Sequence, residues 1–265
     1  MEHTEAVPAT IDQLTVVAPE VDIFLAHAMS MPRTVMYVNA HVFNLASTDT
    51  SLMQALKQAD MVYCDGAGVQ LGAAILKQQM PHRLTSTDWL DRFVETCIRN
   101  NRSLFLMGGK RGIAEKAAQR LRNAHSEVNI VGCHHGYFPK GGIENAGVIR
   151  IVNQAAPDFL IVGFGSPIQE AWIARNRAAL NVPTVWCVGA MMDFVSGSVR
   201  RAPLWMRERR LEWLHRLWLN PKGMWPRYLV GNLWFVGRML RRRWQLETSR
   251  SERTQDANRH RLPAA

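Results

Sequence analysis

Two kinds of hydrophobic pattern alternate between Pro32 and Gly189. Short apolar or β-branched runs are followed by longer segments in which apolar residues recur at helical spacing. This alternation is typical of a parallel sheet whose strands are joined by crossover helices. Strands are predicted over residues 34–38, 60–64, 103–108, 129–132, 158–165 and 184–189. The predicted fold class is α/β, with a Rossmann-like, mostly parallel sheet.

Helical periodicity fills the segments between these strands. The segment after the second predicted strand carries Trp89, Phe93 and Cys97 at the spacing of a half-buried helix. Thr87 precedes this apolar series and is predicted to be the N-cap of the helix. Helices are predicted over residues 49–59, 87–100, 113–124 and 168–180.

The pattern changes after Arg200, where strand signals end and basic, tryptophan-rich helical stretches begin. From Arg200 to Gln245 there are twelve Arg and Lys residues and two acidic residues, and the rest of the chain balances its charges. The whole net charge of +10 therefore lies in this segment, together with six of the nine tryptophans. Pro221 and Pro226 are expected to divide it into short helices.

These changes of pattern predict four parts of the chain. They are an N-terminal extension over residues 1–31, a Rossmann-like domain over 32–197, a helical appendage over 198–247 and a polar, disordered tail over 248–265. Because the appendage follows the last predicted strand, a chain that ends at Val199 is expected to fold without it.

The basic appendage has three interpretations. Arginine-rich segments with interleaved aromatic residues can bind nucleic acid. Attachment to an anionic membrane surface explains the tryptophans better, because indole rings favour the membrane interface and basic residues favour anionic headgroups. The helices could also pack over the substrate loops as a lid. We expect membrane association together with the lid, and no nucleic-acid partner.

Several other classes of protein do not fit the sequence. The N-terminus lacks the basic segment and apolar run of a signal peptide, so we expect no secretion. No stretch approaches the roughly 18–20 consecutive apolar residues of a spanning helix. The four cysteines are far apart and show no metal-ligand spacing, so free thiols are expected. His134 and His135 are adjacent but have no Cys or carboxylate cluster beside them, and no metal is expected.

The loops after the predicted strands are where such a sheet binds its ligand. Five of the six carry glycines, which let the backbone approach a ligand and leave N–H groups free for an anion, so a phosphate-bearing ligand is predicted. Glycine is also common in these loops in any protein of this class. The polar and glycine positions are Asn39, Asp65, Gly66, Gly68, Gly108, Gly109, Gln169, Glu170 and Asp193.

The stretch "DGAGVQLG" has an alternative reading as a dinucleotide fingerprint. Gly66, Gly68 and Gly72 follow a strand, and Asp88 lies near the distance expected of a ribose-binding carboxylate. However, this is not a first strand, and Asp88 lies at a helix start. An NAD(P)-dependent oxidoreductase therefore remains an alternative, as does a non-catalytic protein that binds membranes or nucleic acid.

Asp65 itself could be a turn residue or a helix cap, which are common roles for aspartate. The polar residues expected on the same rim favour a second role. Arg83 follows one helix later, and Glu170 and Asp193 come from later loops. Groups of opposite charge that converge on one rim are what a site for a charged substrate requires.

Seven motifs of the sequence resemble those of a known family. They are "ADMVYCDGAGV", "HRLTSTDWL", "LFLMGGKRGIAEKAA", "GYF", "PDFLIVGFGSPIQEAWI", "VGAMMDFVSGSVRRAPLWM" and "LEWLHRLWLNP". In order, and over about residues 34–236, they resemble the WecG/TagA/CpsF glycosyltransferase family, glycosyltransferase family 26. The resemblance implies a bacterial, inverting enzyme without a cofactor. Such enzymes transfer a sugar from a UDP-sugar to a polyprenyl-diphosphate-linked saccharide at the cytoplasmic membrane face, as peripheral proteins that could form homo-oligomers.

The resemblance also implies roles for single residues. The family's proposed catalytic base falls on Asp65, and its Asn and Arg substrate residues fall on Asn39 and Arg83. Appendage arginines match at Arg201, Arg216 and Arg227. Three positions depart from the family pattern: Tyr37 replaces a small hydroxyl residue, Ile168 replaces a lysine, and "VGAMMD" keeps Asp193 but loses a glycine.

The chemistry of glycosyl transfer agrees with these residues. A nucleoside diphosphate is a good leaving group, so the minimum is one base near the acceptor hydroxyl. Cations or N–H groups must then stabilise the departing diphosphate. Asp65 fits the first role. Arginines fit the second, because the sequence has no clear pair of aspartates for a metal ion.

Overall fold

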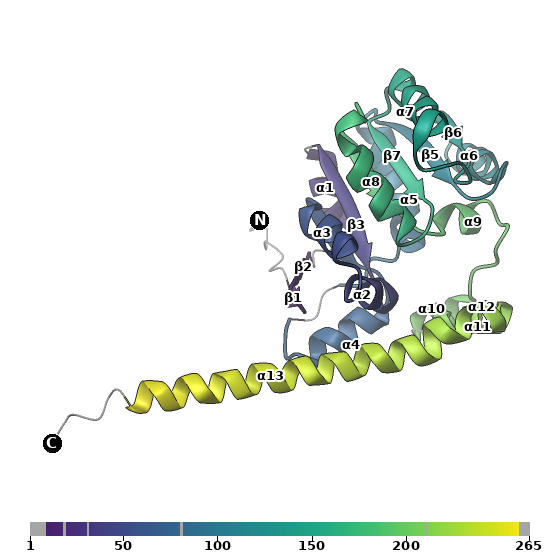
Figure 1. Cartoon of the computed structure of the whole chain (residues 1–265). Coiled ribbons are helices and arrows are strands. Elements are labelled where there is room, and N and C mark those ends of the chain that lie inside the picture. Colours follow the sequence, from purple (N-terminus) through teal and green to yellow (C-terminus); the bar gives the residue numbers. More distant parts are fainter. Residues whose placement is uncertain (1–8, 18–19, 31, 80–81, 210, 260–265) are drawn as a thin grey trace.

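A single six-stranded sheet organises the computed structural model, which describes residues 9–17, 20–30, 32–79, 82–209 and 211–259. Its strand order is β4-β3-β8-β7-β5-β6, and every pairing is parallel (Figure 1). The predicted α/β fold class is confirmed, with all six predicted strands present. They are β3 (Arg33–Val38), β4 (Met61–Cys64), β5 (Ser103–Gly108), β6 (Asn129–His134), β7 (Phe159–Gly163) and β8 (Thr184–Cys187).

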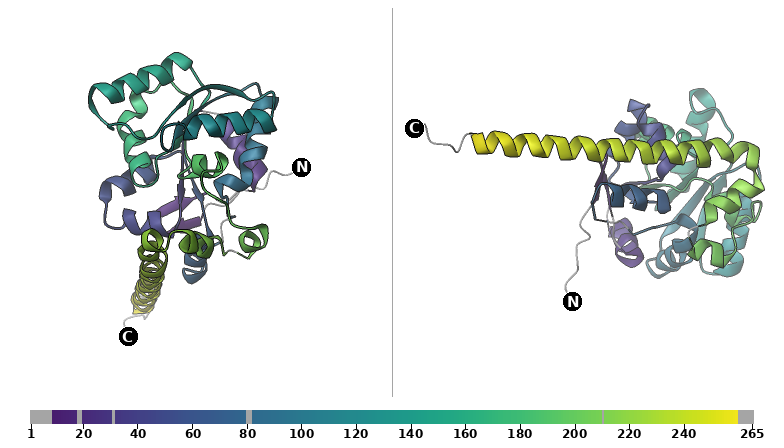
Figure 2. Two further views of the ribbon diagram at one scale, coloured as in Figure 1. Left: turned by 90° about the vertical axis from the view of Figure 1, so that its right-hand side faces the viewer. Right: turned by 90° about the horizontal axis from the view of Figure 1, so that it is seen from below.

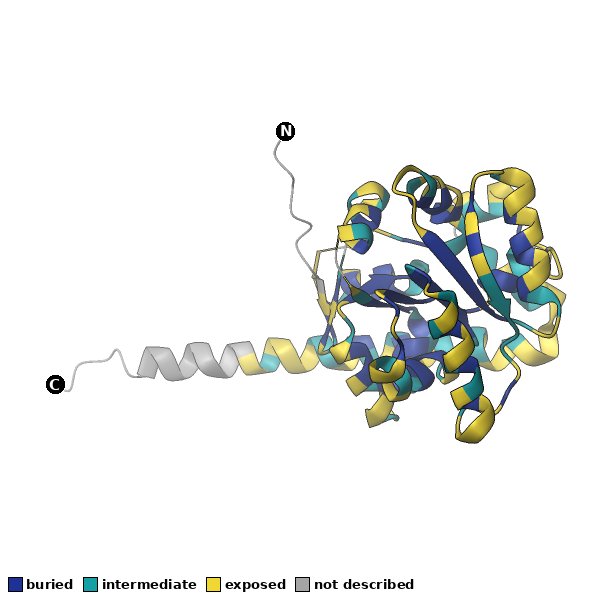
Figure 3. Ribbon diagram, turned by 90° about the horizontal axis from the view of Figure 1, so that it is seen from above, coloured by how far each residue is buried: buried dark blue, intermediate teal, exposed yellow. Residues whose placement is uncertain are grey.

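The strands are apolar on both faces because helices cover both faces of the sheet. Every residue of β4, β5, β7 and β8 is buried, whereas β6 at the sheet edge is partly exposed (Figure 3). The helices between strands are α2 (Ala40–Ala46), α3 (Thr50–Gln58), α4 (Ala67–Ile75), α5 (Ser86–Arg99), α6 (Ile113–Ala124), α7 (Gly142–Ala155) and α8 (Ile168–Asn176), and the short helix α9 (Met191–Val195) follows β8.

Two helix ends differ from the sequence expectation. α5 begins at Ser86, so its N-cap is Thr85 and the prediction of Thr87 was wrong. α8 ends at Asn176, and a 3-10 turn, Arg177–Ala179, replaces its last predicted turn. There the Arg177 guanidinium donates hydrogen bonds to the carbonyls of Leu180 and Pro183, which holds the chain as it enters β8.

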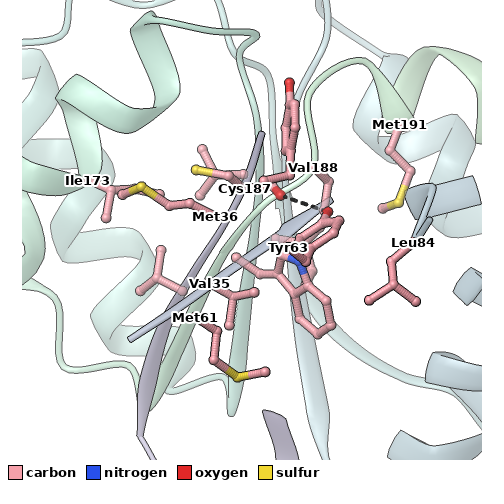
Figure 4. Packing of buried hydrophobic residues seen from close by; sticks show 14 of the residues in the cluster. Val35, Met36, Met61, Tyr63, Leu84, Ile173, Cys187, Val188 and Met191 are labelled. Carbon is pink, nitrogen blue, oxygen red and sulfur yellow. Dashed lines mark hydrogen bonds between the residues drawn. The ribbon is translucent and has the colours of Figure 1, made fainter. Parts of the chain in front are cut away.

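Residues before β3 complete the core, and the sequence analysis assigned no elements to them. They form a small antiparallel hairpin, β1 (Ala9–Ile11) and β2 (Leu14–Val16), followed by α1 (Val21–Ser30). Phe24 of α1 is fully buried against Tyr63 and Trp186, with ring centroids 5.1 and 5.2 Å away. Tyr63 lies at the centre of this packing, where its hydroxyl donates to the Cys187 carbonyl at 3.5 Å (Figure 4).

The C-terminal segment contains helices and short connections but no strand among its described residues. Its elements are α10 (Leu204–Glu208), α11 (Glu212–Leu219), α12 (Pro221–Trp225), a π-helical turn (Pro226–Val230) and α13 (Gly231–Arg259). Pro226 does not end a helix as predicted, because Trp225, Pro226 and Gly231 all have helical dihedral angles. α12, the π turn and α13 therefore form one long rod, which continues past the body of the protein (Figure 2).

The predicted disordered tail over 248–265 also needs correction. The chain remains helical to Arg259, and residues 260–265 lie outside the described residues. The physical reason is composition, since residues 248–259 include three Arg residues, which favour helices, and the stretch contains no Pro or Gly before Pro263. The polarity of this stretch did not exclude a helix.

The first half of α13 is part of the core. Phe235 and Met239 are 1% and 0% exposed, and Phe235 packs 6.0 Å from the Phe43 ring, between centroids. Gly72 of α4 makes room for this contact, because a Cβ there would lie 2.8 Å from the Phe235 ring. Met239 packs at the same place. A chain ending at Val199 would expose this apolar surface, and whether it folds stays a prediction.

Polar contacts hold α13 in the same position. The Arg238 guanidinium donates to the Phe43 carbonyl at 2.9 Å and lies 3.4 Å from the carboxylate of Asp12 in the β1–β2 turn. The Asn44 side chain donates to the Gly231 carbonyl at 2.7 Å. The N-terminal hairpin, α2 and α13 therefore support one another, although they lie at opposite ends of the sequence.

Replacing Phe235 with alanine tests whether α13 belongs to the core. We expect Phe235→Ala to lower the free energy of unfolding by about 3–5 kcal/mol, because it leaves a cavity beside Gly72 and Phe43. The adjacent Leu233 is 76% exposed and serves as the matched control. Urea denaturation would measure both variants. Equal, small effects of Phe235→Ala and Leu233→Ala would show that α13 contributes nothing to the stability of the sheet domain.

Candidate active site

A pocket of about 730 Å³, counting the part open to solvent, lies at the carboxyl ends of β3 and β4. We call it the Asp65 pocket. Its residues come from two distant parts of the chain, the loops after β3 and β4 and the C-terminal helices. They are Asn39, Ala40, His41, Asp65, Gly66, Ala67, Gly68, Arg83, Thr85, Glu212, Trp213, Arg216, Arg227, Tyr228 and Asn232.

Asp65 is held at the tip of β4 by its backbone. Its N–H donates to the Val38 carbonyl of β3 at 2.8 Å, which extends the strand pairing by one residue. Gly66 then turns the chain into α4 with a φ of +103°, a conformation that residues with a side chain rarely adopt. Gly68 lets α4 approach α2, since a Cβ there would lie 2.9 Å from the Ala40 Cβ.

The Asp65 carboxyl has a raised pKa, and burial is the largest cause. Arg216 and Arg227 oppose this rise, whereas the negative charge of Glu212 adds to it. A hydrogen bond from Thr85 also favours the ionised carboxylate, which explains why this N-cap residue makes no capping hydrogen bond to α5. A carboxylate poised above its usual pKa and surrounded by arginines can act as a general base.

Asn39 and His41 form the wall on the side of β3. The Asn39 Oδ1 accepts from the Val42 N–H at 3.0 Å and so caps α2, while the residue also lines the pocket. His41 has a pKa lowered to about 4, first by burial and second by the nearby Arg227. It is therefore neutral at neutral pH and can exchange hydrogen bonds with a ligand without adding charge.

The C-terminal helices form the opposite wall. Arg216 of α11 is paired with Glu212 at 2.7 Å, and its guanidinium stacks 4.8 Å from the centre of the Phe194 ring. Trp213 and Tyr228 pack with ring centroids 6.1 Å apart, and Arg227 lies against Tyr228 at 5.5 Å. This wall therefore places two guanidinium groups and aromatic surface across from Asp65.

A second hollow lies at the carboxyl ends of β5, β7 and β8. We call it the Asp193 pocket. Asp193 has a pKa raised by burial and partly offset by Lys110. Tyr137 is largely exposed at the rim, and the Lys140 ammonium lies 4.2 Å from the centre of the Phe164 ring. Its lining includes Gly109, Lys110, Gly136, Tyr137, Phe138, Lys140, Phe164, Gly165, Ile168, Gly189 and Asp193.

Gln169 and Glu170 do not line either pocket, although both were predicted to bind substrate. Both are 0% exposed. The Glu170 carboxylate accepts from Ser166 at 2.6 Å and from the Gln169 amide at 2.8 Å, and the Gly189 N–H donates to Gln169 at 3.1 Å. Burial raises the pKa of Glu170. Their place beneath the loops makes them supports of the site.

This buried network connects the two pockets. The Tyr37 hydroxyl lies 3.3 Å from the Ser166 hydroxyl, and burial is the largest cause of its raised pKa, with Glu170 and Asp65 adding to the effect. Tyr37 is buried, and its hydroxyl also fills the space beside Gly189, where a Cβ would lie 2.7 Å from it. The departure from a small hydroxyl residue at this position fills that space with a ring.

Seven of the predicted site residues meet in the Asp65 pocket: Asn39, Asp65, Gly66, Gly68, Arg83, Arg216 and Arg227. Gly109 and Asp193 line the other pocket, where Gly108 packs directly against the Gly163 carbonyl. Arg201 lies outside both linings and pairs with Asp88 instead.

Sequence reasoning missed several residues of the Asp65 pocket. His41 could have been found, because it follows Asn39 in a predicted strand-end loop. No such signal marked the pocket residues of the C-terminal helices. The rule that ligands bind at the loops after the strands does not say which face of an appended helix turns back toward the sheet. These residues are Glu212, Trp213, Tyr228 and Asn232.

The described part of the chain holds neither a cluster of metal ligands nor a helix that could span a membrane. Among these residues, no three or more His, Cys, Asp or Glu side chains gather as ligands for a metal ion. None of the described helices has the length and apolar content needed to cross a bilayer. The four cysteines are free, and three of them are buried.

Comparison with known proteins agrees with this geometry. The chain is 26% identical over 199 residues to the N-acetylglucosaminyldiphosphoundecaprenol N-acetyl-beta-D-mannosaminyltransferase of Staphylococcus aureus strain NCTC 8325 / PS 47, which covers 75% of this chain and 77% of that protein. The same values hold for the enzyme of strain COL. The profile described as the "Glycosyl transferase WecG/TagA/CpsF family" matches residues 7–249. Since this match spans nearly the whole chain, the protein belongs to the WecG/TagA/CpsF family of glycosyl transferases.

Proposed function

We propose that this glycosyltransferase moves a sugar from a UDP-sugar to a polyprenyl-diphosphate-linked saccharide, with inversion at the anomeric carbon. The observation that carries the proposal is the placement of Asp65, a carboxyl with a raised pKa in a pocket that also holds Arg83, Arg216 and Arg227. One base and several phosphate-binding cations are the groups that this transfer requires.

The proposed reaction assigns the proton and the leaving group as follows. The Asp65 carboxylate accepts the proton of an acceptor hydroxyl, and the oxygen of that hydroxyl attacks the anomeric carbon. The bond between that carbon and the diphosphate oxygen breaks, and UDP leaves from the opposite face. Arg216 and Arg227 stabilise the charge that develops on the diphosphate, because guanidinium groups match phosphate oxygens in geometry as well as charge.

We place the nucleoside of the donor in the Asp193 pocket. Its exposed aromatic residue, Tyr137, offers a surface for a base, and the Asp193 carboxylate offers acceptors for ribose hydroxyls. The two pockets lie at the same edge of the sheet, because β3 pairs with β8. A donor that bridges them would hold its anomeric carbon near Asp65.

Similarity supplies the first substrates to test. The relatives act on N-acetylglucosaminyl-diphosphoundecaprenol and transfer N-acetylmannosamine, as their names state. We propose a polyprenyl-diphosphate-linked acceptor for this chain too, in the synthesis of a cell-surface polysaccharide of exopolysaccharide, teichoic acid or common antigen type. A panel of UDP-sugars, assayed for UDP release with that acceptor, would identify the sugar.

We also propose that the C-terminal helices bring the enzyme to the cytoplasmic face of the membrane as a peripheral protein. The segment is strongly basic and exposes large apolar side chains. Such residues bind the interface and its anionic headgroups, at about 1 kcal/mol per basic residue near the surface. Those at least 48% exposed are Leu204, Trp205, Trp218, Leu219, Trp225, Leu229, Val230, Leu233, Trp234, Leu240 and Trp244.

If Asp65 is the catalytic base, its replacement with asparagine should slow sugar transfer. Asp65→Asn keeps the size of the side chain but cannot accept the proton, so we expect kcat to fall by about 10²–10⁴-fold. UDP release in the presence of acceptor would measure it. Asp91→Asn, at an exposed position of α5, is the matched control and should transfer sugar at the wild-type rate. Near wild-type transfer by Asp65→Asn would remove the base role.

The charges around Asp65 predict opposite shifts in the pH profile. A base must be ionised, so kcat/KM should fall as the pH falls through the pKa of Asp65. Glu212→Gln removes a negative neighbour and frees Arg216, which lowers that pKa and moves the acid limb to lower pH. Arg216→Gln removes a positive neighbour and moves the limb to higher pH. Shifts in the same direction for both variants would contradict this assignment.

Membrane association predicts a lipid dependence. The protein should co-sediment with vesicles that contain anionic lipid and bind neutral vesicles less, and high salt should weaken the binding because it screens the basic residues. Trp218→Ser combined with Trp225→Ser should reduce binding to anionic vesicles. Tyr137→Ser, an equally exposed aromatic site on the sheet domain, is the control. Equal binding by all three proteins would exclude the tryptophans as membrane contacts.

A further inference from the structure

One carboxylate holds three arginines together beside the Asp65 pocket. Asp88, in the first turn of α5, lies 3.6 Å from the guanidinium of Arg83 and 3.5 Å from that of Arg207. The Arg201 guanidinium donates to the same carboxylate and also to the Thr87 carbonyl, the latter at 3.1 Å. We call these four side chains the Asp88 cluster.

The cluster carries more positive than negative charge. Three guanidinium groups share one carboxylate, and each arginine side chain is less than a quarter exposed, at 22%, 23% and 24%. The Nε atoms of Arg201 and Arg207 are buried and have no hydrogen-bond partner among the described residues. Because water screens these charges incompletely, the carboxylate is what offsets the repulsion between the arginines.

The cluster is one of the places where the C-terminal helices attach to the sheet domain. Arg201 and Arg207 attach the start of the segment to α5, and Phe235 of α13 attaches its far end to α2 and α4. Between these attachments run α11, α12 and the π turn, which carry Arg216 and Arg227 into the Asp65 pocket. The Asp88 cluster therefore fixes the near end of this span.

Arg83 connects the same cluster to the pocket itself. It lines the Asp65 pocket and contacts the Asp88 carboxylate, so the carboxylate that holds α10 also orients a guanidinium in the site. The position of the C-terminal helices and the orientation of Arg83 are thus set by one group. An acidic residue in the first turn of a helix also has a purely structural explanation, as a partner of the helix dipole.

We propose that Asp88 is a positioning residue, which holds Arg83 and the C-terminal helices in the arrangement that transfer requires. Its kinetic part rests on the proposed glycosyl transfer. Asp88 touches no substrate in this proposal and acts through the arginines. Because positive charge is in excess, removal of the carboxylate should disturb the site much more than removal of one arginine.

This asymmetry defines the experiment. In Asp88→Asn three guanidinium groups lose the carboxylate with which they pair among the described residues, and we expect kcat/KM to fall about tenfold or more, mainly through kcat. In Arg207→Gln one surplus charge is lost, and kcat/KM should stay within about twofold of wild type. The matched control is Asp22→Asn. It breaks the exposed ion pair between Asp22 of α1 and Arg92 of α5, the helix that carries Asp88, and should leave the kinetics unchanged.

Hydrogen–deuterium exchange separates positioning from a general structural role. In Asp88→Asn, exchange should rise in residues 201–219, while β3, β5 and α6 keep wild-type protection. An equal rise throughout the sheet domain, or an Arg207→Gln variant as impaired as Asp88→Asn, would overturn the proposal, and so would an Asp88→Asn variant with unchanged kinetics and exchange. If the wild-type protein releases no UDP from any UDP-sugar, the proposed function fails, while the exchange measurement still decides whether Asp88 holds the helices in place.

Discussion

The ionisation of Asp65 depends on charges that arrive from the other end of the chain. Burial alone would favour the neutral acid, and no cation of the sheet domain is as influential on its pKa as Arg216 and Arg227. These arginines reach the site only because α11 and the π turn cross the carboxyl ends of β3 and β4. The packing of the C-terminal helices therefore determines how readily Asp65 ionises. Apolar contacts of Phe235 contribute to this packing.

The C-terminal helices and the sheet domain share one buried core, so they are not separate structural units. The buried surface under α13 comprises Phe43 of α2 and Gly72 of α4, and Asp12 of the N-terminal hairpin pairs with Arg238 above it. The hairpin is itself joined to β4 by a bridge between Val17 and Tyr63. Residues from both ends of the sequence thus complete the same layer, so the loops after β3 and β4 are supported from both sides.

The sheet could be predicted from the sequence because each strand is a short apolar run between polar turns, and strand-end loops must then share one edge. This reasoning placed Asn39, Asp65 and Asp193 at that edge correctly. It could not place Glu212 or Tyr228, since helical periodicity predicts which face of a helix is apolar but not which part of the protein that face packs against. Gln169 and Glu170 show the opposite limit: their polarity suggested a pocket, but a hydrogen-bond network with Ser166 and Gly189 allows them to be fully buried.

The buried acids also explain why the site needs so many arginines. Asp65, Tyr37 and Glu170 all have pKa values raised mainly by burial, and the charges of Asp65 and Glu170 each disfavour ionisation of Tyr37. A negatively charged donor entering beside them would add to the same repulsion. Arginines that stay charged under these conditions can offset it, whereas a lysine could lose its proton, as the lowered pKa of Lys140, about 8, illustrates. For the diphosphate donor that we propose, guanidinium groups are therefore the best partners beside these carboxyls, and the C-terminal helices supply two of them, Arg216 and Arg227.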